Sequence, residues 1–291
     1  MLPEFEFLGP GTLTEALALL AELAPDVTPL AGGTNLIVEL RDGNGSPKKL
    51  MDISRLSELR GIRRDGGHIV IGGGTTISEL LVHPLIEEHG RPLWQAAALL
   101  GNPLVRNRAT VAGNLVNASP AADTAPPLIA LAAEVELTSK KKSRRVPLDE
   151  FMTGVNDTVI RHDELLTSVR WPVPPARSAA AFYKIGLRKA DACSVINAAA
   201  MVVWDDAGRC SQARIAVGAA APRPVRARKA ESALLGRELD GRVIEEAARL
   251  VVDAIQPIDD VRGSAAYRRR MAAVMVRRLL AQIEEHQAGR R

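Results

Sequence analysis

The N-terminal fold can be read from Leu30-Ala31-Gly32-Gly33-Thr34-Asn35-Leu36, where an apolar strand runs into paired glycines and a short helix follows. Upstream, Thr12 and Glu15 have the spacing of a capping box, and leucines follow at helical intervals. The predicted strands are residues 5–8, 27–31 and 50–53, and helices are predicted from Thr12 and over 36–40. This alternation predicts a small α/β subdomain over about residues 1–55.

The paired glycines have two interpretations. A strand that ends in Gly32-Gly33, followed by the Thr34 hydroxyl and the Asn35 amide, lets consecutive backbone N–H groups converge on an anion. A helix that begins at Leu36 adds its positive dipole end. The same residues also suit an ordinary turn, so the pattern alone leaves both a phosphate site and a plain turn open.

A second segment combines small and polar residues: Thr110-Val111-Ala112-Gly113-Asn114-Leu115-Val116-Asn117-Ala118-Ser119-Pro120-Ala121-Ala122-Asp123. Its small residues would let a flat ring or a pyrophosphate lie against the main chain. Asn114, Asn117, Ser119 and Asp123 supply hydrogen-bonding groups. The alternative is an irregular surface loop, with Asp123 capping the next helix.

The rest of the chain predicts a second subdomain and a separate C-terminal domain. Predicted strands in residues 56–173 are 69–72, 134–138, one near Val159 and 165–171, with helices from Thr76 and over 91–100 and 127–132. Lys140 to Arg145 is predicted as a solvated hairpin tip. Pro172-Val173-Pro174-Pro175 is typical of a linker. Beyond it, residues 176–291 predict an antiparallel hairpin, 194–204 and 213–218, and helices over 227–235, 243–255 and 264–285. The expected fold class is therefore α+β.

Composition excludes several functional classes. The chain has 46% apolar residues and a formal charge of +4, but only 3% aromatic residues. A nucleic-acid surface usually interleaves basic residues with stacking aromatics, so a solvated surface or an acidic partner is favoured instead. No apolar run is long enough to span a membrane, and the N-terminus lacks a signal-peptide pattern, so a cytoplasmic protein is expected.

Common cofactor and metal motifs are missing from the sequence. There is no Gly-x-Gly-x-x-Gly fingerprint, and Gly72-Gly73-Gly74 lacks that spacing. The five histidines have no paired metal-binding spacing. Cys193 and Cys210 form no Cys-x-x-Cys pattern and are expected to be free thiols, so the chain cannot hold a cysteine-ligated iron–sulfur cluster.

Together, the two segments make the sequence recognisable. It closely resembles the FAD-binding medium subunit of the molybdenum hydroxylases, the family of xanthine dehydrogenase and aerobic carbon monoxide dehydrogenase. The resemblance continues through residues 164–172 and 183–191 and ends at Tyr267-Arg268-Arg269-Arg270-Met271, so it covers nearly the whole chain. It implies a two-subdomain FAD-binding fold over residues 1–173 and a C-terminal flavoprotein domain over 176–291, with an antiparallel sheet and helices.

The resemblance also implies where FAD binds. Ala31, Gly32, Gly33, Thr34, Asn35 and Leu36 would hold the diphosphate region. Thr110, Gly113, Asn114, Asn117, Ser119 and Asp123 would contact the phosphates, sugar and ribityl hydroxyls. Leu166 and Lys184 fall where family members line the flavin, although Lys184 is also compatible with an ordinary surface lysine. Ala112 departs from the glycine that the family often has there.

For function, the resemblance implies an electron-transfer subunit with no catalytic residues of its own for the organic substrate. The molybdenum cofactor is expected on a large molybdopterin-binding subunit and [2Fe-2S] clusters on a small subunit, in a dimer of heterotrimers. A self-sufficient FAD oxidoreductase, or a scaffold whose FAD site has decayed, remain alternatives. Thr34-Asn35 stands where carbon monoxide dehydrogenases tend to carry His-Ser, which favours a purine or N-heteroaromatic dehydrogenase.

Overall fold

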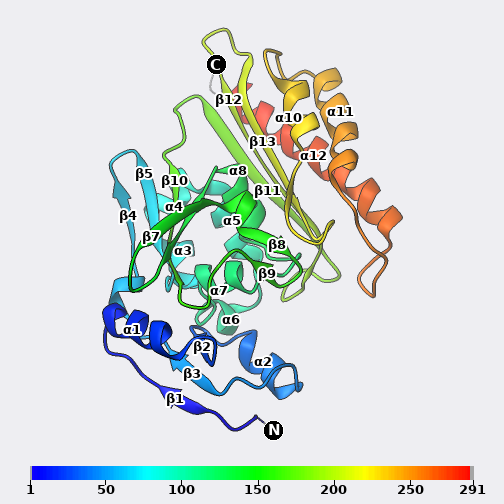
Figure 1. The fold of residues 1–291 in the computed structure, drawn as a ribbon. Coiled ribbons are helices and arrows are strands. Elements are labelled where there is room, and N and C mark those ends of the chain that lie inside the picture. The colour runs from blue at the N-terminus through cyan, green and yellow to red at the C-terminus, as the bar shows by residue number, and fades with distance from the viewer. Residues whose placement is uncertain (1, 289–291) are drawn as a thin grey trace.

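The computed structural model describes residues 2–288, which form three main sheets with helices packed beside and between them (Figure 1). The first sheet lies at the end of the molecule that holds the N-terminus. The second occupies the middle, and the third is covered by the C-terminal helices. The observed mixture of helices and antiparallel strands confirms the predicted α+β class, with the C-terminal sheet antiparallel.

The N-terminal part is a parallel sheet in the order β1-β3-β2, with β1 (Glu6–Leu8), β2 (Val27–Leu30) and β3 (Lys49–Asp52). Parallel neighbours need crossover connections, and α1 (Leu13–Leu23) and α2 (Leu36–Arg41) lie in them. Leucines at helical spacing on α1 pack onto Val27 and Met51. One local detail differs from the expected capping box: the Glu15 carboxylate accepts the N–H of Gly11 at 2.7 Å rather than that of Thr12.

The middle part is built on an antiparallel sheet in the order β4-β5-β10-β6-β7. Its strands are β4 (Ile62–Asp65), β5 (His68–Gly72), β6 (Glu134–Thr138), β7 (Ser143–Pro147) and β10 (Leu165–Pro172), with the small pair β8 (Met152–Gly154) and β9 (Asp157–Thr158) beside them. Its helices are η1 (Ser57–Leu59), α3 (Ile77–Val82), α4 (Pro84–His89), α5 (Arg91–Leu99), α6 (Pro103–Arg106), α7 (Val111–Val116), α8 (Ala125–Ala130) and α9 (Leu148–Phe151).

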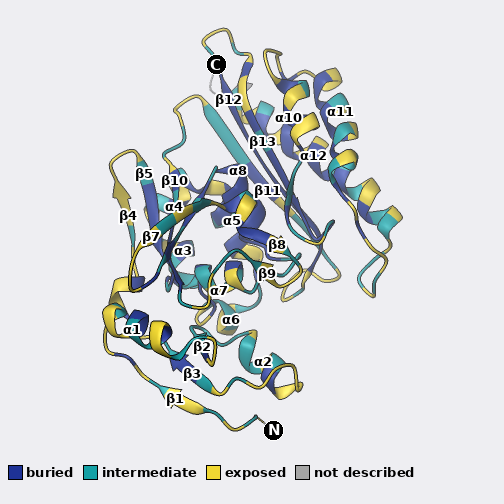
Figure 2. Cartoon of the chain, viewed as in Figure 1, coloured by how far each residue is buried: buried dark blue, intermediate teal, exposed yellow. Residues whose placement is uncertain are grey.

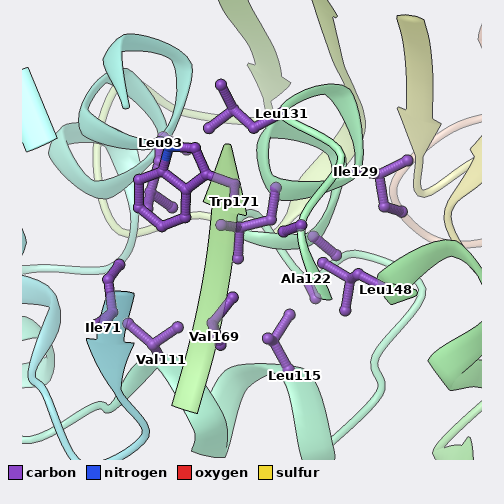
Figure 3. Packing of buried hydrophobic residues seen from close by; sticks show 14 of the residues in the cluster. Ile71, Leu93, Val111, Leu115, Ala122, Ile129, Leu131, Leu148, Val169 and Trp171 are labelled. Carbon is purple, nitrogen blue, oxygen red and sulfur yellow. The ribbon is translucent and has the colours of Figure 1, made fainter. Parts of the chain in front are cut away.

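A continuous aliphatic core joins this sheet to its helices (Figure 3). Trp171 on β10 is fully buried among these side chains, and its indole N–H donates to the His89 carbonyl at 2.9 Å. That hydrogen bond satisfies the one polar atom of the ring inside the core.

The C-terminal part is an antiparallel sheet in the order β11-β12-β13-β14. Its elements are β11 (Ser178–Gly186), β12 (Ser194–Trp204), β13 (Cys210–Gly218), β14 (Val225–Arg226), α10 (Arg228–Leu234), α11 (Gly241–Leu250), η2 (Val251–Ala254) and α12 (Ala265–Ala288). The helices α10, α11 and α12 cover one face, and α5 and α8 of the middle part pack on the other. All of β12 is therefore buried, as Figure 2 shows in dark blue, which accounts for the unbroken run of small and apolar residues over 198–204.

Two interpretations of the sequence need correction. The alternative of an irregular surface loop over residues 110–123 is wrong, because α7 lies within them. Arg144 and Arg145 belong to strand β7 rather than to a solvated tip, and Arg144 reaches inward to the buried Glu164 with two contacts of 2.8 Å. Among residues 2–288, no helix is both long enough and apolar enough to cross a membrane.

Candidate cofactor-binding site

The first glycine loop packs directly against the chain that leads into the second segment. A Cβ atom on Gly32 would lie only 2.0 Å from the Arg108 carbonyl oxygen and 3.1 Å from the Ala109 Cα. Gly33 has a φ of +73°, which side-chain-bearing residues rarely adopt. Both glycines are thus required by the backbone, and the two segments that the sequence singles out lie side by side.

The same loop presents a row of unused backbone donors. Within residues 2–288, the N–H groups of residues 31–35 donate to no other group of the chain. Asn35 stands at the N-cap of α2, yet its side chain makes no capping hydrogen bond. Backbone N–H groups are strong donors that are nearly always satisfied in folded proteins, by water or a ligand where the chain supplies no acceptor. This row fits an anionic group.

The second segment differs from the first, because backbone N–H groups at the start of its helix already donate to acceptors within the chain. The N–H groups of Val111 and Ala112 donate to the carbonyls of Thr75 and Gly73, both at 3.0 Å. The Thr110 hydroxyl accepts the Gly113 N–H at 3.1 Å and so caps α7. Thr110 and Gly113 therefore shape the site: the Gly113 N–H is used within the chain, while the Thr110 hydroxyl can still donate its hydrogen to a ligand.

Further along this segment, polar side chains still have hydrogen-bonding groups that could bind a ligand. The Asn114 side-chain oxygen accepts the Thr124 hydroxyl at 2.6 Å, which leaves its NH₂ group available. The Ser119 hydroxyl accepts the Ala121 N–H at 3.3 Å, and the half-buried Asn117 side chain bonds to none of the other described residues. These three groups suit the hydroxyls of a sugar or polyol.

Gly73 is a closely packed residue beside the proposed site that the sequence did not single out for this role. A Cβ atom there would lie 2.3 Å from the Leu166 carbonyl oxygen and 3.0 Å from the Ala112 Cβ. Leu166 of β10 is buried at this contact, and Ala112 of α7 closes it from the other side. The available signal was a triple glycine directly after a strand, although it lacks the spacing of a dinucleotide fingerprint.

Asp123 and Lys184 meet in a buried polar cluster between the middle and C-terminal parts. The Lys184 ammonium donates to Asp123 Oδ2 at 2.5 Å and to the Leu99 carbonyl at 3.1 Å. The Ser194 hydroxyl and the Asn197 amide donate to Asp123 Oδ1 at 2.6 and 2.8 Å. Only 6% of the Lys184 side chain and 7% of the Asp123 side chain are exposed. Asp123 is therefore not a helix cap, since Thr124 occupies the N-cap position of α8 and makes no capping hydrogen bond there. Lys184 is not an ordinary surface lysine.

Ser194 and Asn197 were also missed by the sequence reading. They are the polar residues at the start of an otherwise apolar strand, and that contrast was the only local signal. Beside the cluster, an open cleft of about 450 Å³ is lined by Lys184, Leu99 and the connection between β11 and β12, including Arg188 and Lys189.

The site fits a flavin dinucleotide better than a metal. It combines a row of free backbone donors, polyol-compatible side chains, close-packed glycines and a buried cation. No group of three His, Cys, Asp or Glu residues among the described residues could hold a metal ion. Both cysteines are free thiols, as expected; Cys193 is exposed, and burial raises the pKa of Cys210 to about 11.

Comparison with known protein families gives matches over nearly the whole chain. Residues 3–174 match the FAD binding domain in molybdopterin dehydrogenase, and residues 181–283 match the CO dehydrogenase flavoprotein C-terminal domain. The chain is 34% identical to the nicotinate dehydrogenase FAD-subunit of Eubacterium barkeri, with 98% of each chain covered. It is 33% identical to the carbon monoxide dehydrogenase medium chain of Hydrogenophaga pseudoflava, with 96% of each covered. It is also 33% identical to a putative xanthine dehydrogenase FAD-binding subunit of Escherichia coli, with 93% of each covered.

Solved structures agree with these relatives. A chain of carbon monoxide dehydrogenase from Hydrogenophaga pseudoflava superimposes with a TM-score of 0.93 at 33% identity, covering 97% of this chain and 98% of that one. Quinoline 2-oxidoreductase from Pseudomonas putida 86 gives a TM-score of 0.91 at 28% identity, covering 99% of both chains.

Proposed function

Because the chain belongs to the FAD-binding subunits of the molybdopterin dehydrogenase family, we propose that it carries electrons from partner iron–sulfur clusters through FAD to an external acceptor. The observation that supports this most directly is the row of unpartnered N–H groups at residues 31–35, packed against the chain before α7. When bound, FAD supplies the redox chemistry; the residues of this chain bind it, orient it and set the charge around it.

The proposed FAD site draws on all three parts of the chain. The main chain from Ala31 to Leu36 would hold the diphosphate. Asn114, Asn117 and Ser119 would bind sugar or ribityl hydroxyls, on a frame set by Thr110 and Gly113. Leu166 and Lys184 would line the flavin, with Asp123 fixing the Lys184 ammonium.

The division of labour follows from the groups that the chain lacks. The described residues present no cluster of metal ligands, and the two cysteines are free. Because relatives of the chain are a medium chain and a complex subunit of larger dehydrogenases, we assign substrate chemistry to a large molybdopterin-binding subunit and the iron–sulfur clusters to a small subunit, in a dimer of heterotrimers in the cytoplasm. Thr34-Asn35 in the first loop favours a purine or N-heteroaromatic substrate for that complex.

Stopped-flow flavin reduction tests this proposal. The isolated FAD-loaded chain should be reduced by dithionite but not by purines, nicotinate, aldehydes or carbon monoxide. Adding the molybdenum and iron–sulfur subunits should make reduction by the correct substrate fast. Rapid reduction by substrate in the isolated chain would instead identify a self-sufficient flavoenzyme, and a purified chain that cannot bind FAD would identify a scaffold.

A further inference from the structure

The C-terminal helix carries a buried arginine that the FAD site does not use directly. Arg268 of α12 is only 2% exposed. Its guanidinium donates to the Val195 carbonyl at 2.9 Å, to the Ile258 carbonyl at 2.6 Å and to Asp260 Oδ1 at 2.7 Å. Arg262 holds the other Asp260 oxygen at 2.7 Å, and it is the first cause of a pKa of Asp260 well below the usual range, with Arg268 contributing further. Each of the three Arg268 guanidinium nitrogens therefore donates to an acceptor within the chain.

Val195 is an irregular point in strand β12. In the pairing of β11 with β12, Ile185 faces Ile196 and the next residue, Gly186, faces Ser194, so Val195 is an extra residue without a partner. The pairing of β12 with β13 begins only at Asn197. Val195 is therefore the bulged residue of a β-bulge, and its carbonyl oxygen accepts a hydrogen bond from Arg268.

The bulge explains how the buried polar cluster forms. Residues three apart on a regular strand point to opposite faces of the sheet. Ser194 and Asn197 are three apart, yet both donate to the same oxygen of Asp123, and they are 3.2 Å from each other. The extra residue between them turns the Ser194 side chain onto the face of Asn197. Bulges commonly re-aim a side chain in this way next to functional sites.

We propose that Arg268 is a positioning residue that clamps the β-bulge at Val195, keeps Ser194 on Asp123, and thereby holds the Lys184 ammonium at the FAD site. This inference rests on the proposed function. Gly263 also lies close to the bulge, because a Cβ atom there would lie 3.2 Å from Val195 Cγ1. Arg268, the second residue of the motif Tyr267-Arg268-Arg269-Arg270, is thus the residue that gives this motif its positioning role.

The test compares FAD affinity and the flavin midpoint potential in four full-length proteins: wild type, Arg268→Lys, Ser194→Ala and the double variant. Loss of the clamp or of the Ser194 hydrogen bond should each weaken FAD binding about tenfold, the scale of one buried hydrogen bond to a charged group. Arg268→Lys and Ser194→Ala should also shift the flavin midpoint potential in the same direction. Because the two residues act in one chain of contacts, the double variant should be no worse than either single variant.

Arg262→Lys is the matched control, because Arg262 shares Asp260 but does not reach Val195. It should leave FAD affinity and potential at wild-type values, even if the melting temperature falls. If Arg268→Lys does not fold, Asp260→Asn loosens the same guanidinium and should weaken FAD binding as Ser194→Ala does. Asp260→Asn also loosens Arg262, and Arg262→Lys measures that part of its effect.

Two results would overturn the proposal while leaving the proposed function intact. One is wild-type affinity and potential in folded Arg268→Lys or Asp260→Asn. The other is additive losses in the double variant, which would mean that Arg268 acts elsewhere than through Ser194. Failure of the wild-type chain to bind FAD would instead reject the proposed function itself.

Discussion

At Gly33 the main chain has a φ of +73°, and a Cβ atom would lie 3.2 Å from Ile37 Cγ1 and 3.3 Å from Leu30 Cδ1. Gly33→Val therefore adds a β-branched side chain in a disfavoured conformation, at a cost of about 1–3 kcal/mol. We expect a folded protein that purifies without its yellow colour, as measured by the visible spectrum.

Gly66→Val is the control for Gly33, since Gly66 also has a positive φ, +57°, but lies in the open turn between β4 and β5. It should carry similar backbone strain and keep its flavin. Wild-type flavin content in Gly33→Val would reject the assignment of the first loop to the diphosphate.

Lys184→Met tests the charge beside the proposed flavin. Because Lys184 and Asp123 are both buried, removing the ammonium leaves an unpaired carboxylate and should cost about 3–5 kcal/mol of stability. It should also lower the flavin midpoint potential by an amount equivalent to about 1–2 kcal/mol, or roughly 20–40 mV for a two-electron couple. Adding Asp123→Asn should recover most of the stability, since neither charge then remains. An unchanged potential in a redox titration would place the ammonium away from the ring.

At the scale of single elements, local sequence signals predicted some helix starts and missed others. The helix predicted from Thr76 begins there, and Thr76 and Glu79 form a capping box of α3 with both reciprocal hydrogen bonds present. Thr110 caps α7 through its hydroxyl alone, because the residue three positions later is Gly113 rather than Glu or Gln. Without that second half of the pattern, nothing local distinguished α7 from a loop.

The buried cluster shows why the rest of the site could not be predicted locally. Asp123 precedes a helix, and such a position normally favours a cap. Its actual partners, Lys184, Ser194 and Asn197, come from strands more than sixty residues away (61, 71 and 74), so tertiary contacts override the local preference. The bulge at Val195 depends on strand pairing and leaves no clear local mark in the sequence.

The pair Arg144–Glu164 ties β7 to the start of β10 and gives a pH-dependent prediction. The hydrogen bonds from Arg144 are the main cause of a lowered pKa of Glu164, and the Arg161 N–H contributes. A lowered folded-state pKa stabilises the fold above the unfolded value, about 4.3, and this stability is lost as the pH falls through the folded value. Glu164→Gln should be roughly 2–3 kcal/mol less stable at pH 7 and should lose less stability on acidification.

Glu136→Gln is the matched control for Glu164, because Glu136 of β6 pairs at 3.5 Å with the exposed Arg145, which follows Arg144 on β7. Such an exposed pair contributes less than about 1 kcal/mol. Denaturant unfolding between pH 3 and pH 7 measures the free energy of unfolding of both variants. Parallel pH profiles for Glu164→Gln and wild type would show that this carboxylate does not govern acid stability.

At the scale of the whole molecule, the proposed site is shared by parts that are far apart in sequence. The free N–H groups lie in the N-terminal part, α7 in the middle part and Lys184 in the C-terminal part. The division of the chain into residues 1–173 and 176–291, with subdomains of about 1–55 and 56–173, stays a prediction. A ligand that binds to all three parts would hold them together, whatever their exact boundaries.

FAD should therefore stabilise the whole chain by linkage, since a ligand that binds only the folded state adds RT ln(1 + [L]/Kd). At a free FAD concentration one hundred times Kd, the expected gain is about 2.7 kcal/mol, or roughly 4–5 °C in melting temperature for a chain of this size. Thermal melts of apoprotein at increasing FAD concentration measure it. Gly33→Val should show no such rise, while Gly66→Val should follow wild type. The contrary result is a melting temperature that rises only for a transition of the N-terminal part, while the C-terminal helices melt independently of FAD. That result would exclude Lys184 and its strand from the site and leave only the first two parts in it.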